Sequence, residues 1–437
     1  MRKSIRQKAL LIIQDVLNKG AFLDEELLIL QDSNIDIRDY NLIVNLVTGV
    51  IENKLLLEHI IKINSKIKLK KIHPIIKNIL SLGIYQIFFT DKIPEYSIVN
   101  ESVKLAKIYG NSGSAGYING MLRNILKNRD EIKKNNYYID KKNIINYLST
   151  LYSHPEFYIN ILLRSKNYEE VERILKINNS PAPFTIRLNT LKISKEDLVK
   201  ELRNLNFIVK ETKSSKFGIK VLNSNGILNT SLFKKGYFYV QDEASILVGE
   251  NHIINDGDLI LDMCASPGGK SFNVAMRNKS ISIISCDVSN KKIRRIEENK
   301  NRLGIENIKT MVSDGCKFNN DFISKFDSII IDAPCSGVGL YRRHPDIKWN
   351  KTLEDINNLT DIQFKILSNG AKYVKPLGYI TYSTCSITEE ENENLIERFL
   401  NENSNFKIIK TNNEDTYKLY PTDECDGFSI TRLQRMI

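Results

Sequence analysis

From about residue 241 onward, short apolar runs alternate with amphipathic segments, and this alternation limits the possible folds more than any other feature. Strands that alternate with helices form a parallel sheet with helices on both faces. The sequence therefore predicts a Rossmann-like α/β domain over residues 241–437, with residues 290–303 and 356–374 as two of its helices. Its expected strands are residues 258–263, 281–286, 308–312, 326–331 and 379–383, followed by a short edge hairpin of residues 406–409 and 428–433.

The first part of the chain has a different pattern. Within residues 1–130 the apolar residues recur at helical spacing, which predicts a helix bundle that includes residues 74–89 and 97–109. Residues 131–240 are expected to form a linker and a small α+β subdomain, with Ser194 as the N-cap of a helix. The whole is a multidomain α and α/β protein, as its 437 residues suggest for domains of about 100 to 200 residues.

The net charge of +11 and the pI near 9.1 indicate a polyanionic partner, and nucleic acid is the leading candidate. More than half of the excess positive charge lies in residues 1–130, so a basic bundle that holds RNA phosphates is one hypothesis. The alternative is that the lysine-rich stretch 62–71 is only the solvated face of a helix. The sequence favours neither.

The six cysteines contain no C-x-x-C pair and lie near no histidine-rich segment, which argues against a zinc site and a disulfide framework. The apolar patch near the N-terminus is broken by Asp15 and Lys19 before it reaches the length of a signal peptide or membrane helix. We expect a cytoplasmic protein with no membrane segment and no metal.

Polar residues follow the first three predicted strands, where an α/β sheet binds its ligand. The first strand runs into the turn Cys264 to Lys270, whose glycines allow close approach to a ligand, although a structural turn would explain them equally well. Asp287 follows the second strand and suits a ribose, whereas Asp314 follows the third and suits an adenine. With no phosphate site evident, S-adenosylmethionine fits better than NAD.

Two thiols follow the next two strands. Cys335 comes after Asp332-Ala-Pro, and Cys385 lies in Ser383-Thr-Cys-Ser386. Adjacent parallel strands would bring both cysteines to one cleft, although a lone cysteine is usually a small buried hydrophobe. Methylation at C5 of cytosine requires such a thiol, because the ring carbon must first be activated by addition at C6. Asp332 would then stabilise the base at its N3 edge.

Three motifs together carry a resemblance to a known family: residues 262–270 (DMCASPGGK), residues 332–337 (DAPCSG) and residues 383–386 (STCS). The chain resembles the RNA 5-methylcytosine methyltransferases of the Nol1/Nop2/Sun type. Residues 38–39, 46–50, 99–103 and 116–119 are similar to the NusB-like domain found in its bacterial 16S ribosomal RNA enzyme. The resemblance thus implies an N-terminal NusB-like RNA-binding domain, 16S ribosomal RNA as substrate, and an enzyme expected to act as a monomer.

The resemblance also assigns roles that the residues alone do not. Cys385 would be the nucleophile, Cys335 would promote product release, and Asp332 would hold the base. Ser266 and Ser271 depart from the usual Ala and Thr without removing a needed group. The implied S-adenosylmethionine contacts are Cys264, Ala265, Ser266, Pro267, Gly268, Gly269, Lys270, Asp287, Asp314 and Asp332.

Three alternatives stay open: a related enzyme that acts on tRNA or another ribosomal RNA site, an amino-group methyltransferase, and an RNA-binding factor without activity. The amino-group enzymes usually carry an Asn/Asp-Pro-Pro-aromatic motif, which this chain lacks. Additional RNA contacts are expected at Arg187, Asn189 and the loop of residues 342–345, which would form a wall of the cleft. A surface role is equally possible for Arg187 and Asn189.

Overall fold

The chain, described here from a computed structural model that covers residues 3–31 and 35–437, divides into two compact units. One unit contains Met1–Ser180 together with Tyr341–Asn350. The other contains Pro181–Leu340 and Lys351–Ile437. The short segment 341–350, which follows the cysteine motif at residue 335, thus packs with the N-terminal part of the chain.

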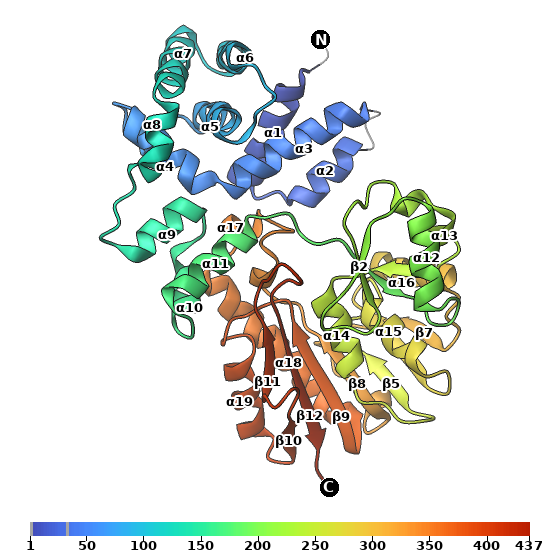
Figure 1. Cartoon of the computed structure of the whole chain (residues 1–437). Helices are drawn as coiled ribbons and strands as arrows, with labels where there is room; N and C mark the ends of the chain where they lie inside the picture. The colour runs from blue at the N-terminus through green and yellow to red at the C-terminus, as the bar shows by residue number, and fades with distance from the viewer. Residues whose placement is uncertain (1–2, 32–34) are drawn as a thin grey trace. The chain divides into compact units, whose positions relative to one another are not determined.

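The first unit is helical in the residues that the structure describes, as predicted. Helix α5 is buried along most of its length because apolar residues occupy all of its faces, and it packs against α1, α3, α4, α6 and α7 (Figure 1). The predicted helix 74–89 is confirmed, and the next one begins two residues earlier than expected, directly after Pro94. The helices are α1 (Ile5–Lys19), α2 (Leu23–Gln31), α3 (Ile37–Glu52), α4 (Lys54–Asn64), α5 (Pro74–Phe89), α6 (Glu95–Tyr109), α7 (Ser112–Lys127), α8 (Arg129–Lys134), α9 (Ile144–Tyr152), α10 (Glu156–Leu163), α11 (Tyr168–Asn178) and α17 (Ile347–Asn350).

The second unit begins with a small antiparallel sheet in the strand order β2-β3-β1-β4. The predicted cap is confirmed, since the Ser194 hydroxyl accepts a hydrogen bond from the Asp197 N–H at 3.1 Å. Strand β3 was not predicted, because a four-residue segment with Gly and Lys carries no clear alternation. The elements are β1 (Thr185–Leu188), α12 (Lys195–Asn204), β2 (Val209–Glu211), β3 (Gly218–Val221), α13 (Ser231–Lys234) and β4 (Phe238–Val240).

A larger sheet follows, in the strand order β10-β12-β9-β8-β5-β6-β7, with β11 paired to β12. Strands β5 to β9 are parallel, which confirms the predicted Rossmann-like fold. The elements are α14 (Glu243–Asn251), β5 (Leu259–Asp262), α15 (Gly269–Arg277), β6 (Ser282–Asp287), α16 (Asn290–Leu303), β7 (Ile308–Val312), β8 (Phe326–Asp332), α18 (Leu353–Tyr373), β9 (Val374–Thr384), α19 (Glu393–Glu402), β10 (Phe406–Ile409), β11 (Thr416–Leu419) and β12 (Phe428–Arg435).

The strand order places a ligand crevice. From β5 the chain moves outward to β6 and β7, then returns to the other side of β5 with β8 and β9. The order therefore reverses between β5 and β8, and ligands of such sheets bind beyond the carboxyl ends of strands at this point.

The predicted edge hairpin is wrong in one respect. Strand β12 does pair with β10, but it also pairs with β9 and so lies inside the sheet. Ile430 and Leu433 are fully buried there. The apolar pattern showed a strand, whereas its place in the sheet depends on the long β9, which extends from residue 374 rather than 379.

Two expected RNA contacts are wrong because the side chains are buried. Arg187 is 1% exposed, and its guanidinium donates to the Asn273 side-chain oxygen at 3.0 Å. Asn189 is fully buried and donates to the carbonyl oxygens of Gly236 and Leu303. Arg187 thus joins β1 to α15, and Asn189 joins the end of β1 to the end of α16, both within the second unit.

The loop 342–345 also differs from its prediction as an exposed wall. Arg342 is only 6% exposed, and none of its neighbours through Asn350 is fully exposed. The His344 ring lies 3.1 Å from the Asp24 carboxylate, whose hydrogen bond raises the pKa of His344 above its ordinary value. The Trp349 ring N–H donates to the Ile51 carbonyl at 2.7 Å. This loop is a packed part of the first unit.

The lysine-rich stretch remains open to both interpretations. Lys62, Lys66, Lys68, Lys70 and Lys71 are all exposed, as either an RNA-binding or a merely solvated surface requires. None of the helices in the described part of the chain is long and apolar enough to cross a membrane.

Candidate active site

The two thiols lie together, as the sequence predicted. Strands β8 and β9 are adjacent and parallel, with Asp332 opposite Ser383, so Cys335 and Cys385 leave the sheet at the same edge. The backbone N–H of Cys385 donates to the Cys335 sulfur at 3.2 Å. Both cysteines are half-buried.

The surroundings of Cys335 disfavour its ionised form. The hydrogen bond between the Cys335 and Cys385 side chains is the largest cause that raises the pKa of Cys335, and burial and the charges of Glu391 and Asp332 raise it further. Cys335 therefore keeps its proton well above neutral pH.

Asp332 ends β8 and is held by two side chains. The Lys270 ammonium lies 2.6 Å from Oδ2, and the Ser383 hydroxyl donates to Oδ1 at 3.0 Å. Lys270 also donates to the Ser245 hydroxyl at 3.1 Å and lies 5.3 Å from the centre of the Phe428 ring. The sequence predicted Lys270 as part of the cofactor-binding turn. In the structure its ammonium group also contacts Asp332.

The glycine turn follows β5 and is closely packed. The Ala265 N–H donates to the Cys286 carbonyl at 2.8 Å, and the Ser266 N–H donates to Asp287 Oδ2 at 3.0 Å. Gly268 has a φ of +108°, and a Cβ there would lie 2.2 Å from the Phe272 ring. Only glycine fits this position. The two hydrogen bonds tie the turn between β5 and α15 to the end of β6.

Buried acidic and thiol groups surround this turn. Burial raises the pKa of Asp262 to about 7, although the Ser271 hydroxyl donates to its carboxylate at 2.6 Å. Burial also raises the pKa of Cys264 well above its ordinary value, and the nearby charges of Asp262, Asp287 and Asp332 add to this shift. Burial thus disfavours a thiolate at Cys264.

Asp314 follows β7 and lines a small hollow with mostly apolar walls. An apolar slot with a carboxylate and a hydroxyl at one side has the chemistry that an adenine ring requires. Its lining residues are Leu261, Met263, Cys286, Ser313, Asp314, Gly315, Lys317, Phe322 and Tyr373.

Sequence reasoning missed four polar residues that support these groups: Ser245, Ser383, Glu391 and Asn392. Glu391 and Asn392 are fully buried, although they lie in the acidic run 389–393 that is typical of an exposed segment. Their closeness to Cys385 along the chain was the available signal. Ser383 was quoted only as part of its motif.

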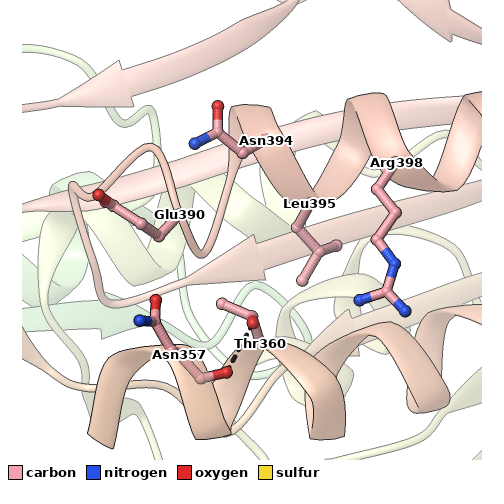
Figure 2. Close-up of a pocket in the computed structure, with 6 residues that line it drawn as sticks. All are labelled: Asn357, Thr360, Glu390, Asn394, Leu395 and Arg398. Atoms are coloured by element: carbon pink, nitrogen blue, oxygen red, sulfur yellow. Dashed lines mark hydrogen bonds between the residues drawn. The ribbon is translucent and has the colours of Figure 1, made fainter. Parts of the chain in front are cut away.

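A second, more open pocket lies between α18 and α19 and contains none of the predicted site residues (Figure 2). Its Arg398 stacks 3.9 Å from the centre of the Phe364 ring and pairs with Asp361 at 3.2 Å. Asn357 and Thr360 are joined by a hydrogen bond within α18. The pocket has no nucleophile, so we assign it no part in the chemistry.

The six cysteines are all free. Among residues 3–31 and 35–437, no three His, Cys, Asp or Glu side chains are grouped so that they could hold a metal ion.

Comparison with protein families gives three matches along the chain. The model described as "16S rRNA methyltransferase RsmB/F" matches residues 253–434. That of the "NusB family" matches residues 3–127, and that of the "Methyltr_RsmF/B-like, ferredoxin-like domain" matches residues 154–227. The ferredoxin-like match corresponds to much of the small antiparallel sheet.

Individual relatives agree with these matches. "Probable ribosomal RNA small subunit methyltransferase B" of Bacillus subtilis is 33% identical over 384 residues, covering 87% of this chain and 84% of the relative. "Ribosomal RNA small subunit methyltransferase B" of Photorhabdus laumondii is 30% identical over 99% of this chain and 98% of its own length. Among solved structures, a methyltransferase homolog protein from Pyrococcus horikoshii is 27% identical, with a TM-score of 0.60 over 68% of this chain and 100% of that one.

Proposed function

Because the chain belongs to the RsmB/F family of 16S rRNA methyltransferases, we propose that it methylates C5 of a cytosine in 16S ribosomal RNA, with S-adenosylmethionine as the methyl donor. The rRNA substrate is supported by the names of the relatives. The choice of C5 rests on one observation: Cys335 and Cys385 lie together beyond the carboxyl ends of β8 and β9, where the Cys385 backbone N–H donates to the Cys335 sulfur. Transfer to an exocyclic amine would need neither thiol.

The same residues fit the proposed cofactor. The turn Cys264 to Lys270 and the strand-end acids Asp287, Asp314 and Asp332 surround the reversal point of the sheet. Asp287 would hold the ribose hydroxyls, and the hollow at Asp314 would take the adenine. When bound, S-adenosylmethionine would supply an electrophilic methyl group.

Cys385 is proposed as the nucleophile. Its thiolate would form a bond to C6 of the cytosine, which moves electrons toward C5 and makes that carbon nucleophilic. The raised pKa of Cys335 argues against Cys335 as the attacking thiolate and so supports this order. Asp332, held by Lys270 and Ser383, would bind the N3 edge of the ring and stabilise its developing charge.

Cys335 is proposed to act at the end of the reaction. Loss of the C5 proton and cleavage of the C6–S bond restore the aromatic ring and release Cys385. A thiol next to the leaving sulfur can promote this cleavage. Cys335 is thus a release residue rather than the nucleophile.

We also propose a division of labour along the chain. Residues 1–130 would be the NusB-like RNA-binding domain, residues 131–240 a linker with a small RNA-binding subdomain, and residues 241–437 the methyltransferase domain. The three family matches at residues 3–127, 154–227 and 253–434 support this division.

The experiment that tests the proposal compares two cysteine variants. We expect Cys385→Ala to abolish methyl transfer to small-subunit rRNA, and Cys335→Ala to leave a covalent protein–RNA complex that survives denaturation. Cys425→Ser changes a buried cysteine whose apolar cluster packs against Cys385, so it controls for a general effect of altering a nearby cysteine, and it should retain activity. The measurements are transfer of labelled methyl groups and gel electrophoresis under denaturing conditions.

Three outcomes would contradict parts of this proposal. A trapped complex with the Cys385 variant would reverse the two roles. Full activity in both variants would exclude the covalent route. Bisulfite sequencing of rRNA and tRNA from cells without the protein locates the substrate, and an unchanged 16S pattern would reject the proposed target.

A further inference from the structure

Glu391 is a fully buried carboxylate with four hydrogen-bond donors around it. Oε1 accepts from the Ser336 N–H at 2.7 Å and from the Gln363 side chain at 3.0 Å. Oε2 accepts from the Ser336 hydroxyl at 2.5 Å and from the Thr388 hydroxyl at 3.0 Å. Burial of a carboxylate is costly unless hydrogen-bond donors satisfy its oxygens. The four donors therefore fix the position of the Glu391 side chain.

The donors come from both sides of the thiol pair. Ser336 directly follows Cys335, and Thr388 lies three residues after Cys385. Gln363 of α18 also donates to the carbonyl of Pro334, the residue before Cys335, at 2.9 Å. Glu391 and Gln363 therefore hold the chain on both sides of Cys335.

Asn392 holds the chain on both sides of Cys385. Its side-chain oxygen accepts from the Thr384 hydroxyl at 2.7 Å, and its side-chain nitrogen donates to the Thr388 carbonyl at 2.7 Å and the Ser386 carbonyl at 3.4 Å. Thr384 and Ser386 are the residues on either side of Cys385. Two consecutive buried residues thus hold the flanks of two different cysteines.

We propose that Glu391 and Asn392 are positioning residues that fix the Cys335 turn and the Cys385 loop in the register that brings the two sulfurs together. This inference rests on the proposed covalent function. Within the part of the chain that the structure describes, Glu391 makes no hydrogen bond to either thiol, so it acts through Ser336 and Thr388. Its carboxylate also contributes to the raised pKa of Cys335.

The decisive variant is Glu391→Gln. A glutamine has one acceptor oxygen and directs an NH₂ group toward donors, so it cannot satisfy the four bonds. We expect kcat for methyl transfer to fall by on the order of 10²-fold, because a misplaced catalytic group costs about that much. The KM for rRNA and the Kd for S-adenosylmethionine should stay within about twofold. Asn392→Ala should act in the same direction.

A matched control and two further readouts separate positioning from general damage. Glu397→Gln, on an exposed face of the following helix α19, should leave kcat unchanged. In a Cys335→Ala background, Glu391→Gln should slow formation of the covalent complex with rRNA. With Cys335 present, removal of the negative charge should move the pH profile of adduct release toward lower pH.

Wild-type kcat in Glu391→Gln would overturn the inference, and so would a loss of kcat matched by an equal loss of S-adenosylmethionine affinity. If Glu391 variants do not fold, Ser336→Ala is the second test. It removes the hydroxyl donor to Glu391 and leaves the carboxylate itself in place. It should lower kcat about tenfold. An unaffected Ser336→Ala enzyme would likewise reject the inference. A wild-type enzyme that transfers no methyl group to cytosine C5 would instead reject the proposed function itself.

Discussion

Strand β8 carries a lysine–aspartate pair at each of its ends, and the two pairs have the same separation. At the carboxyl end, Lys270 lies 2.6 Å from Asp332. At the amino end, Lys375 lies 2.6 Å from Asp327. The first pair adjoins the two thiols and the cofactor turn, whereas the second lies where β8 begins.

The comparison indicates that place on the sheet, and not the Lys–Asp distance, separates the pair with a proposed role in the chemistry from the structural pair. Ligands meet a parallel sheet at the carboxyl ends of its strands, so polar groups there face a substrate. At the amino end they bond to the protein itself: Asp327 also accepts from the Leu259 N–H at 2.9 Å, which joins β8 to β5. We therefore expect the carboxyl end of β8 to support the proposed chemistry and the amino end to support stability.

The largest expected effect is at the carboxyl end. Lys270→Ala should lower kcat for methyl transfer by on the order of 10²-fold, because Asp332 loses the cation that orients it beside the base. Labelled methyl transfer at saturating substrate measures this loss. Lys375→Ala is the matched control with the same bond length, and equal kcat losses in both variants would remove the contrast between the two ends.

A second prediction concerns His252, which lies near the amino end and is fully buried. Its ring bonds to the hydroxyls of Ser328 on β8 and Thr381 on β9, and burial lowers its pKa to about 3, with Arg277 and Arg432 adding to the shift. The unfolded chain binds a proton below pH ~6.5, whereas the folded one does not until pH ~3. Stability should therefore fall as the pH drops through this window, by up to ~1.4 kcal/mol per unit.

Chemical denaturation at pH 7 and pH 5 tests this expectation. His252→Gln should lose less stability between these pH values than the wild type. Equal pH dependence in wild type and His252→Gln would show that His252 is not the titrating group. The activity of His252→Gln per folded molecule at pH 7 should be near that of the wild type, because His252 lies near the amino end of β8, away from the proposed site.

The smallest effect is expected from Lys375→Ala itself. Burial tends to raise the pKa of Asp327, but the hydrogen bonds from Lys375 and the Leu259 N–H outweigh it, so the pKa lies below its ordinary value. The pair therefore stabilises the fold above the unfolded pKa of about 3.9, and this contribution is lost as the pH falls through the lower folded pKa. Because both side chains are partly exposed, the variant should cost less than ~1 kcal/mol at neutral pH, measured by denaturant unfolding. A larger loss, or a loss of kcat, would contradict the assigned role.

Much of the fold and the centre of the site followed from local pattern. The alternation after residue 241 predicted the parallel sheet, and the positions of Cys335 and Cys385 after neighbouring strands predicted their contact. These inferences succeed because side-chain period and strand ends are properties of a short segment. They need no knowledge of what the segment packs against.

Burial of polar groups did not follow from pattern. Arg187 was predicted as a possible RNA contact, but its partner Asn273 lies 86 residues away in the sequence. Arg342 belongs to a motif beside Cys335 and yet packs with the N-terminal unit. Glu391 lies in an acidic run that predicts exposure, and it is nevertheless enclosed by four donors from three segments.

The sequence by itself determined the fold class, the edge of the sheet where chemistry occurs and the two sulfurs that meet there. Only the tertiary structure decided which polar side chains are held inside, that Lys270 pairs with Asp332, and that Glu391 and Asn392 bond to the segments that carry the thiols. The reason is physical: periodicity is set by neighbours along the chain, whereas the desolvation of a charge is offset only by partners that folding brings from elsewhere.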